Sequence, residues 1–227
     1  MDYESLMEVI RQRRTTRVYR PDAIPDEFVL KVIEAARWAP TGANTQPFEF
    51  VIVKDNGVRT KIKKIFEETT MVVEKVSAKA PVPRVSIRNF LETAPVLILV
   101  LGDPRFKQAY PRGKHRDEIF HASLSAAVQN MHLAATALGL GGSVWTTVSF
   151  VAAVKIKDLL HIPQIFTLKT IMPLGRPKAR PAPPVKREPL VHQEHYDPAG
   201  FKSDDQVKEV IEKTTTSKGK LSRFRRL

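Results

Sequence analysis

The chain has 227 residues, of which 42% are apolar and 27% are charged. This balance is typical of a folded globular protein and excludes the compositions of disordered and fibrous chains. The absence of cysteine excludes disulfides, thiolate nucleophiles and sulfur-ligated metals. The formal net charge of +13 predicts an anionic partner, and charge alone leaves open a nucleic acid, a membrane or a phosphorylated small molecule.

The first element is expected to be a short helix that ends in a cluster of arginines. Leu6, Val9 and Ile10 recur at helical spacing. The polar stretch that follows, "RQRRTTRVYRP", holds five arginines and two threonines and ends at Pro21. The opening "MDYESLMEVI" carries acids where a secretion signal carries basic residues, so we expect no export signal and a cytoplasmic protein.

A second helix, a loop and a strand follow. The helix begins near Pro25, since proline is tolerated in a first turn, and it ends before Pro40. Turn-forming residues fill the loop "APTGANTQP" at 39–47. The apolar stretch "FEFVIV" predicts a strand over 48–53.

The middle of the chain is expected to hold a buried strand and a long helix. Residues 57–90 read as helix, with a Val- and Lys-rich middle that the pattern does not place. The run "APVLILVLG" is too short to cross a bilayer and predicts a buried strand over 96–101. A polar loop at 103–118 leads into a helix over 117–138, whose many Ala and Ser residues fit either a deep core or a subunit contact.

The last third combines a helix, a strand and an extended arm. "GLGGSVW" is expected to end the long helix and to lead into a short strand. Ser149 is expected to cap a helix that runs through Leu160. A last strand is predicted over 167–173, and five prolines keep residues 176–189 extended. A short helix at 204–213 precedes a tail, and residues 213–227 hold six basic residues and no acid.

The order of these elements predicts an α+β fold, with a mixed central sheet and helices packed on both of its faces. We expect this domain to span residues 1–198. Residues 199–227 then form a C-terminal extension that carries the short helix and the basic tail.

Several common catalytic motifs are absent from the sequence. The chain has no P-loop, no G-x-S-x-G elbow and no H-E-x-x-H zinc motif. "GLGG" at 139–142 lacks the third glycine of a dinucleotide fingerprint and follows a helix rather than a strand. His121 and His132 are spaced to share a helix face, but without clustered carboxylates we predict no metal site.

The arginine cluster has the composition of a phosphate site. Fixed guanidinium groups and a hydroxyl hold a dianionic phosphate better than flexible ammonium groups do. A helix end followed by a turn can aim several such donors at one point, and a solvated basic helix end is the alternative. The candidate phosphate ligands are Arg13, Arg14, Thr15 and Arg17.

The loop at 39–47 carries a second set of candidates. Asn44 and Gln46 each offer a donor and an acceptor, and Pro40, Gly42 and Pro47 stiffen the loop around them. Such a loop can read a flat heterocycle with alternating N–H and C=O groups. An ordinary helix-to-strand connection would tolerate the same residues.

Together these motifs give the chain a family resemblance. "RRTTRVYRPDAIPDEFVLKVIEAARWAPTGANTQPFEFVIV" resembles the opening of the nitroreductase family of FMN-dependent oxidoreductases. "AAVQNMHLAATALGLGGSVW" is similar to the family's central helix and flavin loop, and "MPLGRPKARPAPPVKREPL" to its closing strand and arm. The resemblance covers roughly residues 4–196. Thr15 stands where serine is common and Phe48 where tryptophan is common.

The resemblance implies an FMN site without a protein nucleophile, in which flavin N5 accepts a hydride from NADH or NADPH and passes it to an acceptor. Nitroaromatics, quinones and free flavins are the implied acceptors. The implied FMN ligands are Arg13, Arg14, Thr15 and Arg17 at the phosphate, with Lys186 and Arg187 from the arm; Pro40, Thr41, Asn44 and Gln46 at the ring; and Val144, Trp145, Thr146 and Thr147 near N5.

The resemblance also implies an intertwined homodimer with FMN at its interface, and the Ala- and Ser-rich helix is its natural two-fold contact. Substrate choice is expected to lie in the loop at 103–118 and the segment before Phe90. Phe106, Tyr110 and Phe120 are candidates to stack on an aromatic substrate, with core or surface packing as the alternative.

Two further interpretations stay open at this stage. One is a specialised flavin enzyme of the same fold, such as a reductive dehalogenase or a flavin-consuming enzyme. The other is a basic protein whose tail, "SKGKLSRFRRL", contacts nucleic acid or an anionic membrane. A solvated tail is the plain alternative to that second interpretation.

Overall fold

The computed structural model describes residues 2–76, 89–110, 115–141, 148–184, 186, 189 and 191–216. These fall into two compact units, Met1–Ala182 and Pro183–Leu227. The predicted domain boundary at 198/199 stays a prediction.

The first unit is built on a three-stranded antiparallel sheet in the order β1-β2-β3. Its strands are β1 (Phe48–Val53), β2 (Val96–Gly102) and β3 (Thr167–Leu174). The predicted bounds of all three are confirmed to within one residue. A mixed sheet would need a strand beyond these three, because both pairings among the described strands are antiparallel.

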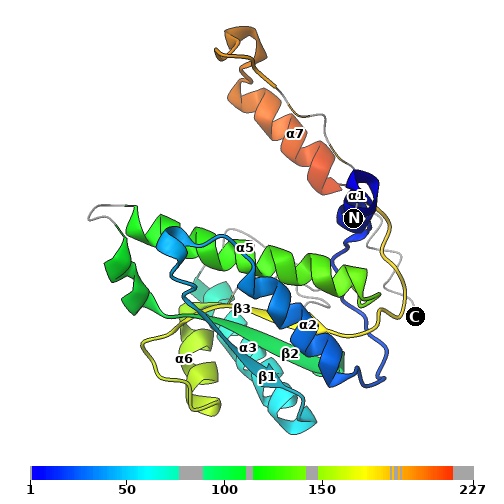
Figure 1. The fold of residues 1–227 in the computed structure, drawn as a ribbon, viewed down its shortest axis with the longest axis vertical. Helices are drawn as coiled ribbons and strands as arrows, with labels where there is room; N and C mark the ends of the chain where they lie inside the picture. The colour runs from blue at the N-terminus through cyan, green and yellow to red at the C-terminus, as the bar shows by residue number, and fades with distance from the viewer. Residues whose placement is uncertain are drawn as a thin grey trace. The chain divides into compact units, whose positions relative to one another are not determined.

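Helices cover both faces of this sheet, which confirms the α+β prediction (Figure 1). One face packs against α2 (Asp26–Arg37) and α5 (Arg116–Ala137), and the other against α3 (Asn56–Val76), α4 (Asn89–Thr93) and α6 (Phe150–Leu159). The remaining elements of this unit are α1 (Tyr3–Gln12), η1 (Gly42–Asn44) and η2 (Pro104–Ala109).

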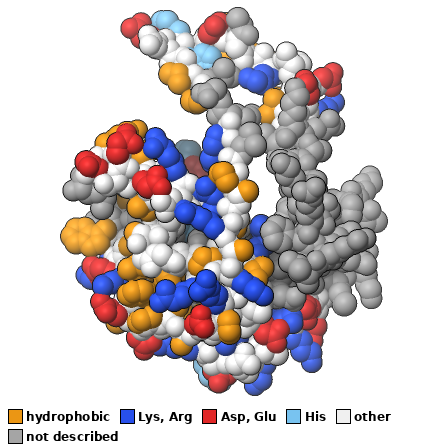
Figure 2. Space-filling view, turned by 90° about the vertical axis from the view of Figure 1, so that its right-hand side faces the viewer, with side chains coloured by type: hydrophobic (Ala, Val, Ile, Leu, Met, Phe, Trp, Pro, Cys, Tyr) orange, Lys and Arg blue, Asp and Glu red, His pale blue; other side chains and the backbone are white. Residues whose placement is uncertain are grey.

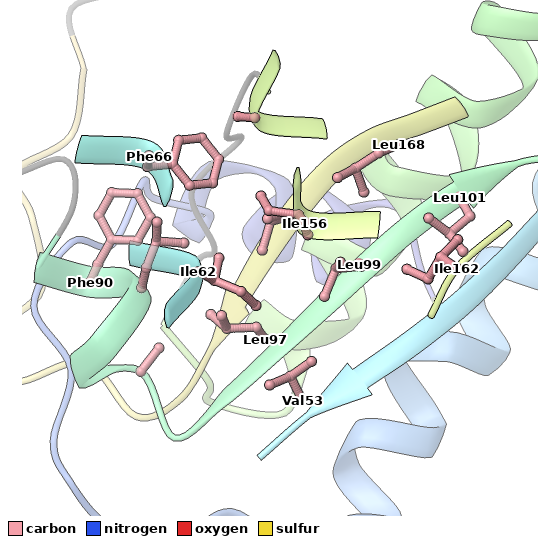
Figure 3. Close-up of a cluster of buried hydrophobic side chains, with 14 of the residues drawn as sticks. Val53, Ile62, Phe66, Phe90, Leu97, Leu99, Leu101, Ile156, Ile162 and Leu168 are labelled. Atoms are coloured by element: carbon pink, nitrogen blue, oxygen red, sulfur yellow. The ribbon is translucent and has the colours of Figure 1, made fainter. Parts of the chain in front are cut away.

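The central strand β2 explains why the fold needs both helical layers. All seven of its residues are buried, so each face must be covered. Leu97, Leu99 and Leu101 enter the cluster beneath α3 and α6, which Figure 3 shows with Phe66 and Phe90. The alternate residues Val96, Ile98 and Val100 enter the cluster beneath α2 and α5. The period of two along a strand therefore divides the core into two halves.

Local signals fix several element ends. Ser149 caps α6 as predicted, because its side chain accepts a hydrogen bond from the Ala152 N–H at 3.2 Å. Asp2 caps α1 in the same way through the Ser5 N–H at 2.8 Å. The predicted loop at 103–118 contains the 3₁₀ helix η2, and Asp103 accepts the Arg105 N–H at its start.

The second unit contains η3 (Pro198–Gly200) and α7 (Asp204–Thr216), so the predicted C-terminal helix is present and runs three residues further. The short strand predicted after "GLGGSVW", and the middle of the 57–90 segment at 77–88, lie outside the described residues. None of the described helices is long and apolar enough to span a membrane.

Candidate functional site

The arginine stretch leaves the end of α1 and runs along the surface of the first unit. Arg13 is the C-cap of α1, with its N–H donating to the Val9 carbonyl at 3.1 Å. Arg14 donates from Nη1 to the carbonyls of Arg11 and Arg13, so part of its guanidinium caps the helix end. Arg13, Arg14 and Thr15 are half-buried and Arg17 is exposed.

Backbone pairing joins this stretch to the segment that follows β3. The Arg20 N–H donates to the Arg176 carbonyl at 2.8 Å, and the Lys178 N–H donates to the Val18 carbonyl at 3.0 Å. Tyr19 is buried between them, and its hydroxyl donates to the carbonyls of Thr16 and Pro173 at 3.2 and 3.3 Å. Burial raises the pKa of Tyr19, so this hydroxyl stays protonated and keeps donating.

A cavity of about 180 Å³ lies where this pairing meets the end of α5. The residues of its lining with polar side chains are Gln12, Arg14, Thr16, Thr136 and Arg180. Among the described residues, three side-chain N or O atoms are buried without a hydrogen-bond partner. Two of them, Arg14 Nε and Thr16 Oγ1, belong to this lining, and the third is Arg59 Nε. The lining comprises Gln12, Arg14, Thr16, Thr136, Gly139, Leu140, Gly141, Pro177, Arg180 and Pro181 and contains no acid. It therefore offers spare donors in a basic setting, which suits an anion.

Glycine is required at one wall of this cavity. A Cβ on Gly141 would lie 2.8 Å from Thr16 Oγ1 and 2.9 Å from Pro177 Cβ. Gly141 also donates its N–H to the Gly175 carbonyl at 2.9 Å, so its backbone cannot move away cheaply. The cavity thus borders the start of the predicted flavin loop.

Sequence reasoning selected Thr15 here and missed Thr16. Thr15 is half-buried, whereas Thr16 is 1% exposed and carries the unpartnered hydroxyl. The two threonines are adjacent and chemically identical, so only the direction of each side chain distinguishes them.

The loop at 39–47 is held in an unusual backbone conformation. Ala43, Asn44 and Gln46 have φ angles of 48°, 51° and 46°, in the left-handed region that non-glycine residues rarely adopt. Such strain persists only when the surroundings enforce it, and it is common at binding sites. The side chains of Asn44 and Gln46 are exposed, as recognition of a ligand's polar edge requires.

Hydrogen bonds to α5 and η2 enforce this conformation. The Gly42 N–H donates to Ser123 Oγ at 3.1 Å, and Thr45 Oγ1 lies 3.0 Å from the Tyr110 hydroxyl. Within the loop, the Gln46 N–H donates to Thr41 Oγ1 at 3.1 Å. Thr41 is half-buried and its hydroxyl oxygen is engaged within the loop, while Pro40 is exposed.

The two halves of the predicted site lie at opposite ends of α5 in one chain. Gly42 bonds Ser123 near the start of this helix, whereas Thr136 near its end lines the cavity with Arg14. Thirteen residues of helix separate the two contacts, which is about 20 Å at 1.5 Å per residue. This is further than the phosphate of one FMN lies from the polar edge of its ring.

The predicted substrate aromatics divide into core and surface residues. Tyr110 and Phe120 are 2% and 0% exposed and form a core cluster with Leu124. These two aromatics therefore follow the alternative interpretation, packing in the core. Phe106 is 42% exposed. Lys186 is exposed in the second unit, while Val144, Trp145, Thr146, Thr147 and Arg187 lie outside the described residues.

The pKa of His132, in the C-terminal half of α5, is shifted by its surroundings. Burial, with a contribution from the Arg13 charge, lowers the pKa of His132 to about 4. His132 is thus neutral at pH 7 and adds no charge beside Arg13. The described residues contain no cluster of three or more His, Cys, Asp or Glu side chains suited to a metal ion.

A larger cavity, of about 560 Å³, lies elsewhere and contains none of the predicted cofactor ligands. It is lined by residues before α2, at the start of α3 and around α4, including Asp26, Lys54, Arg59 and Glu92. Lys54 pairs with Asp26, and Arg59 donates to the Glu92 carbonyl at 2.7 Å, so these charges hold neighbouring elements together.

Comparisons with known proteins support the motif resemblance. Residues 10–176 match the model of the nitroreductase family. Human iodotyrosine deiodinase 1 is 31% identical over 198 residues, which cover 82% of this chain and 66% of the relative. A protein of Archaeoglobus fulgidus named for NADH dehydrogenase/NAD(P)H nitroreductase is 32% identical over 177 residues, which cover 77% of this chain and 87% of that protein.

Solved structures share the fold. Oxidised iodotyrosine deiodinase bound to FMN and 3-iodo-L-tyrosine has a TM-score of 0.69 and 24% identity, over 84% of this chain and all of that one. A nitroreductase-type protein of Desulfovibrio desulfuricans in complex with FMN has a TM-score of 0.62 and 28% identity, over 85% of this chain and 98% of that one. The chain spans just under two thirds of the length of the human deiodinase.

Proposed function

Because the chain belongs to the nitroreductase family, we propose that it is an FMN-dependent oxidoreductase that passes a hydride from NADH or NADPH through flavin N5 to a small-molecule acceptor. The observation that carries this proposal is the acid-free cavity with two buried, unpartnered donors at the end of α5. A bound phosphate would satisfy such donors, which otherwise cost free energy when buried.

The residues present fit FMN at both ends of the ligand. Arg13, Arg14, Thr15 and Arg17 are proposed to hold the phosphate, together with the buried Thr16 hydroxyl and with Lys186 and Arg187 from the arm. Asn44 and Gln46 would bond the polar edge of the ring, beside Pro40 and Thr41, and Val144, Trp145, Thr146 and Thr147 would lie near N5. When bound, FMN supplies the hydride chemistry, so the chain itself needs no nucleophile.

The chain's own residues are proposed to position the flavin ring and to set the charge around its phosphate. Rigid hydrogen bonds to Ser123 and Tyr110 fix the ring loop before any ligand arrives, which lowers the entropic cost of binding. Neutral His132 leaves the positive charge beside the phosphate to the arginines. Exposed Phe106 remains a candidate to stack on the acceptor.

We propose that a homodimer completes the site. Because the two half-sites are about 20 Å apart along α5, a second copy with its α5 antiparallel brings the ring loop of one chain to the phosphate ligands of the other. The exposed face of α5 carries small residues such as Ala122, and α1 buries none of its residues, so both surfaces are free to pair. Ala122→Glu is expected to yield a monomer in analytical ultracentrifugation.

Reductive dehalogenation is a second candidate function. It is favoured by the iodotyrosine deiodinases among the relatives, at 28–31% identity. The two candidates differ in the acceptor and share the reduced flavin.

One spectroscopic experiment tests the proposal. The protein is loaded with FMN, desalted, and its visible spectrum is recorded before and after anaerobic addition of NADH or NADPH. Retained flavin bands that bleach would support the proposal and identify the donor, and a protein that retains no flavin would refute it. Nitroaromatics, quinones and 3-iodo-L-tyrosine are then compared as oxidants of the reduced enzyme.

The basic tail remains a separate proposal. Residues 217–227 lie outside the described residues, so contact of the tail with nucleic acid or membrane rests on its sequence. Nucleic-acid binding that falls steeply with salt, and disappears on deletion of residues 214–227, would support that role. A cytoplasmic location also stays a prediction.

A further inference from the structure

A basic face covers more of the first unit than one phosphate requires. Two segments far apart in sequence form it, residues 11–20 and 176–180. The chain has no acid between Glu8 and Asp22, and none between Asp158 and Glu188. The basic residues of the two segments are Arg11, Arg13, Arg14, Arg17, Arg20, Arg176, Lys178 and Arg180.

Backbone pairing places these charges on one surface. The isolated bridge between Tyr19 and Pro177, with the hydrogen bonds of Arg20 and Lys178, holds the two segments side by side. Arg180 Nη2 adds a longer contact of 3.4 Å to the Gln12 carbonyl. Figure 2 shows Lys and Arg side chains gathered on the face of this unit that is turned to the viewer.

Burial divides the face into two tiers. Arg13, Arg14 and Arg176 are half-buried, whereas Arg11, Arg17, Arg20, Lys178 and Arg180 are exposed. Among the described residues, Arg11 alone of these eight forms an ion pair, with Glu4 at 3.4 Å. The half-buried tier with Arg17 is enough for a phosphate dianion, and Arg11 is paired with Glu4. Arg20, Lys178 and Arg180 remain as exposed cations without an ion pair among the described residues.

The shape and chemistry of the exposed tier indicate the class of partner. A small ligand needs a concave site, and apart from Arg180 these exposed side chains line neither cavity described above. A single-stranded nucleic acid needs aromatic side chains for stacking, and the aromatic residue of the two segments, Tyr19, is 4% exposed. An exposed cationic ribbon instead suits the acidic surface of another protein, and redox encounters need only a small, electrostatically steered contact.

We propose that this face docks an acidic electron-transfer protein, which acts as a further electron donor to the flavin. The inference rests on the proposed function, because it places the docking face beside the phosphate end of the FMN site. Two encounters, each oxidising one donor protein by one electron, reduce FMN by two electrons, and water supplies the protons. Charge complementarity acts on the association rate, so the docking is sensitive to salt.

The test uses the FMN-loaded full chain and a chemically reduced [2Fe–2S] ferredoxin with an acidic surface, mixed anaerobically in a stopped-flow instrument. The variant is Arg20→Gln with Lys178→Gln. Both residues pair the two segments through backbone N–H groups, which the substitutions retain. The matched control is Lys61→Gln with Lys64→Gln, which removes two exposed charges from α3 instead.

We expect a rate constant for FMN reduction that falls steeply with ionic strength. At low ionic strength it should fall about fivefold in the variant and stay near the wild-type value in the control, since steering charges change association rates. FMN retention and reduction by dithionite should be the same in all three proteins, which shows that the proposed flavin site is intact.

Three results would overturn the proposal. The first is a ferredoxin rate that is insensitive to salt and equal in variant and control. The second is a raised KM for NADPH in the variant with an unchanged ferredoxin rate, which would assign the face to a nucleotide phosphate. The third is salt-sensitive binding of duplex DNA that is lost in the variant while ferredoxin reduces all three proteins equally. Failure of the proposed function is visible separately, as wild-type protein without a retained flavin band.

Discussion

The segments packed at the two ends of α5 differ in whether their polar groups have hydrogen-bond partners. On the N-terminal side, Gly42 bonds Ser123, two turns into the helix, and Thr45 bonds the hydroxyl of Tyr110, which precedes it. The loop is therefore closed by internal hydrogen bonds. At the other end, Arg14 Nε and Thr16 Oγ1 are buried without a partner among the described residues. The loop end is closed by hydrogen bonds within the fold, whereas the other end leaves two buried donors unpaired, as the proposed phosphate site requires.

This difference assigns a separate role to each end. The closed end stores backbone strain at Ala43, Asn44 and Gln46 and presents two exposed amide side chains in a fixed geometry. The open end supplies charge and hydrogen-bond donors. Substitutions of the residues that close the loop should therefore act on folding, and substitutions at the open end on ligand binding.

The largest effect is expected from Gly42→Ala at the closed end. The new Cβ would collide with the Ile119 side chain and lie 2.9 Å from Tyr110 Cε1. Overpacking of this kind costs about 1–3 kcal/mol of unfolding free energy. Urea unfolding followed by circular dichroism measures the loss. Gly139→Ala cannot serve as the control, because Gly139 has a φ of 68° and alanine would be strained there. A midpoint equal to wild type would show that the loop is not tightly closed.

Arg17→Ala should act on binding instead. A charge-assisted hydrogen bond is worth roughly 1.5–3 kcal/mol, so the Kd for FMN should rise about tenfold to a hundredfold. Quenching of flavin fluorescence measures the Kd, and the stability of the FMN-free protein should stay near wild type. Lys61→Ala, an exposed cation on α3, is the control. An unchanged Kd would remove Arg17 from the phosphate site.

The open end should also respond to pH through His132. Its pKa in the folded state is about 4, below the ordinary 6.5, so the unfolded chain binds the extra proton between these values. The stability that depends on neutral His132 is therefore complete above pH 6.5 and is lost as the pH falls toward 4. Because each tenfold change in proton affinity is worth about 1.4 kcal/mol, the fall of the pKa from 6.5 to about 4 makes the full loss about 3 kcal/mol.

Urea unfolding at pH 7 and pH 4.5 measures this loss, and His132→Gln should reduce the difference between the two conditions. Other carboxylates contribute to acid destabilisation in both proteins, so the comparison isolates the histidine. The same pH dependence in the variant would show that His132 titrates normally.

The smallest effects come from a matched pair of hydroxyl deletions. Thr16→Val removes a hydroxyl without a described partner, so the FMN-free protein should lose no stability, while FMN should raise the Tm less than in wild type. Ser123→Ala removes the acceptor of the Gly42 N–H and should cost about 1 kcal/mol without FMN. Thermal unfolding of both variants with and without FMN measures these changes in Tm. If both variants lose the same stability without FMN, the two ends of α5 do not differ in the way described.

Much of this protein was predictable from the sequence because its signals are local. The apolar stretch "FEFVIV" predicted β1, a continuous apolar run predicted β2, and the Ser149 cap predicted the start of α6. The family was also predictable, because the arginine cluster and the "APTGANTQP" loop are contiguous motifs with a characteristic order.

Tertiary structure alone decided which polar groups are buried and which lie together. The burial of Thr16 rather than Thr15, and of Tyr110 and Phe120 in the core, depends on how distant elements pack. The pairing of residues 18–20 with 176–178 joins segments more than 150 residues apart, which no local pattern encodes. Local chemistry therefore determined the elements and the family. Long-range packing determined the distance between the two predicted half-sites, the two unpaired buried donors and the basic face beside them.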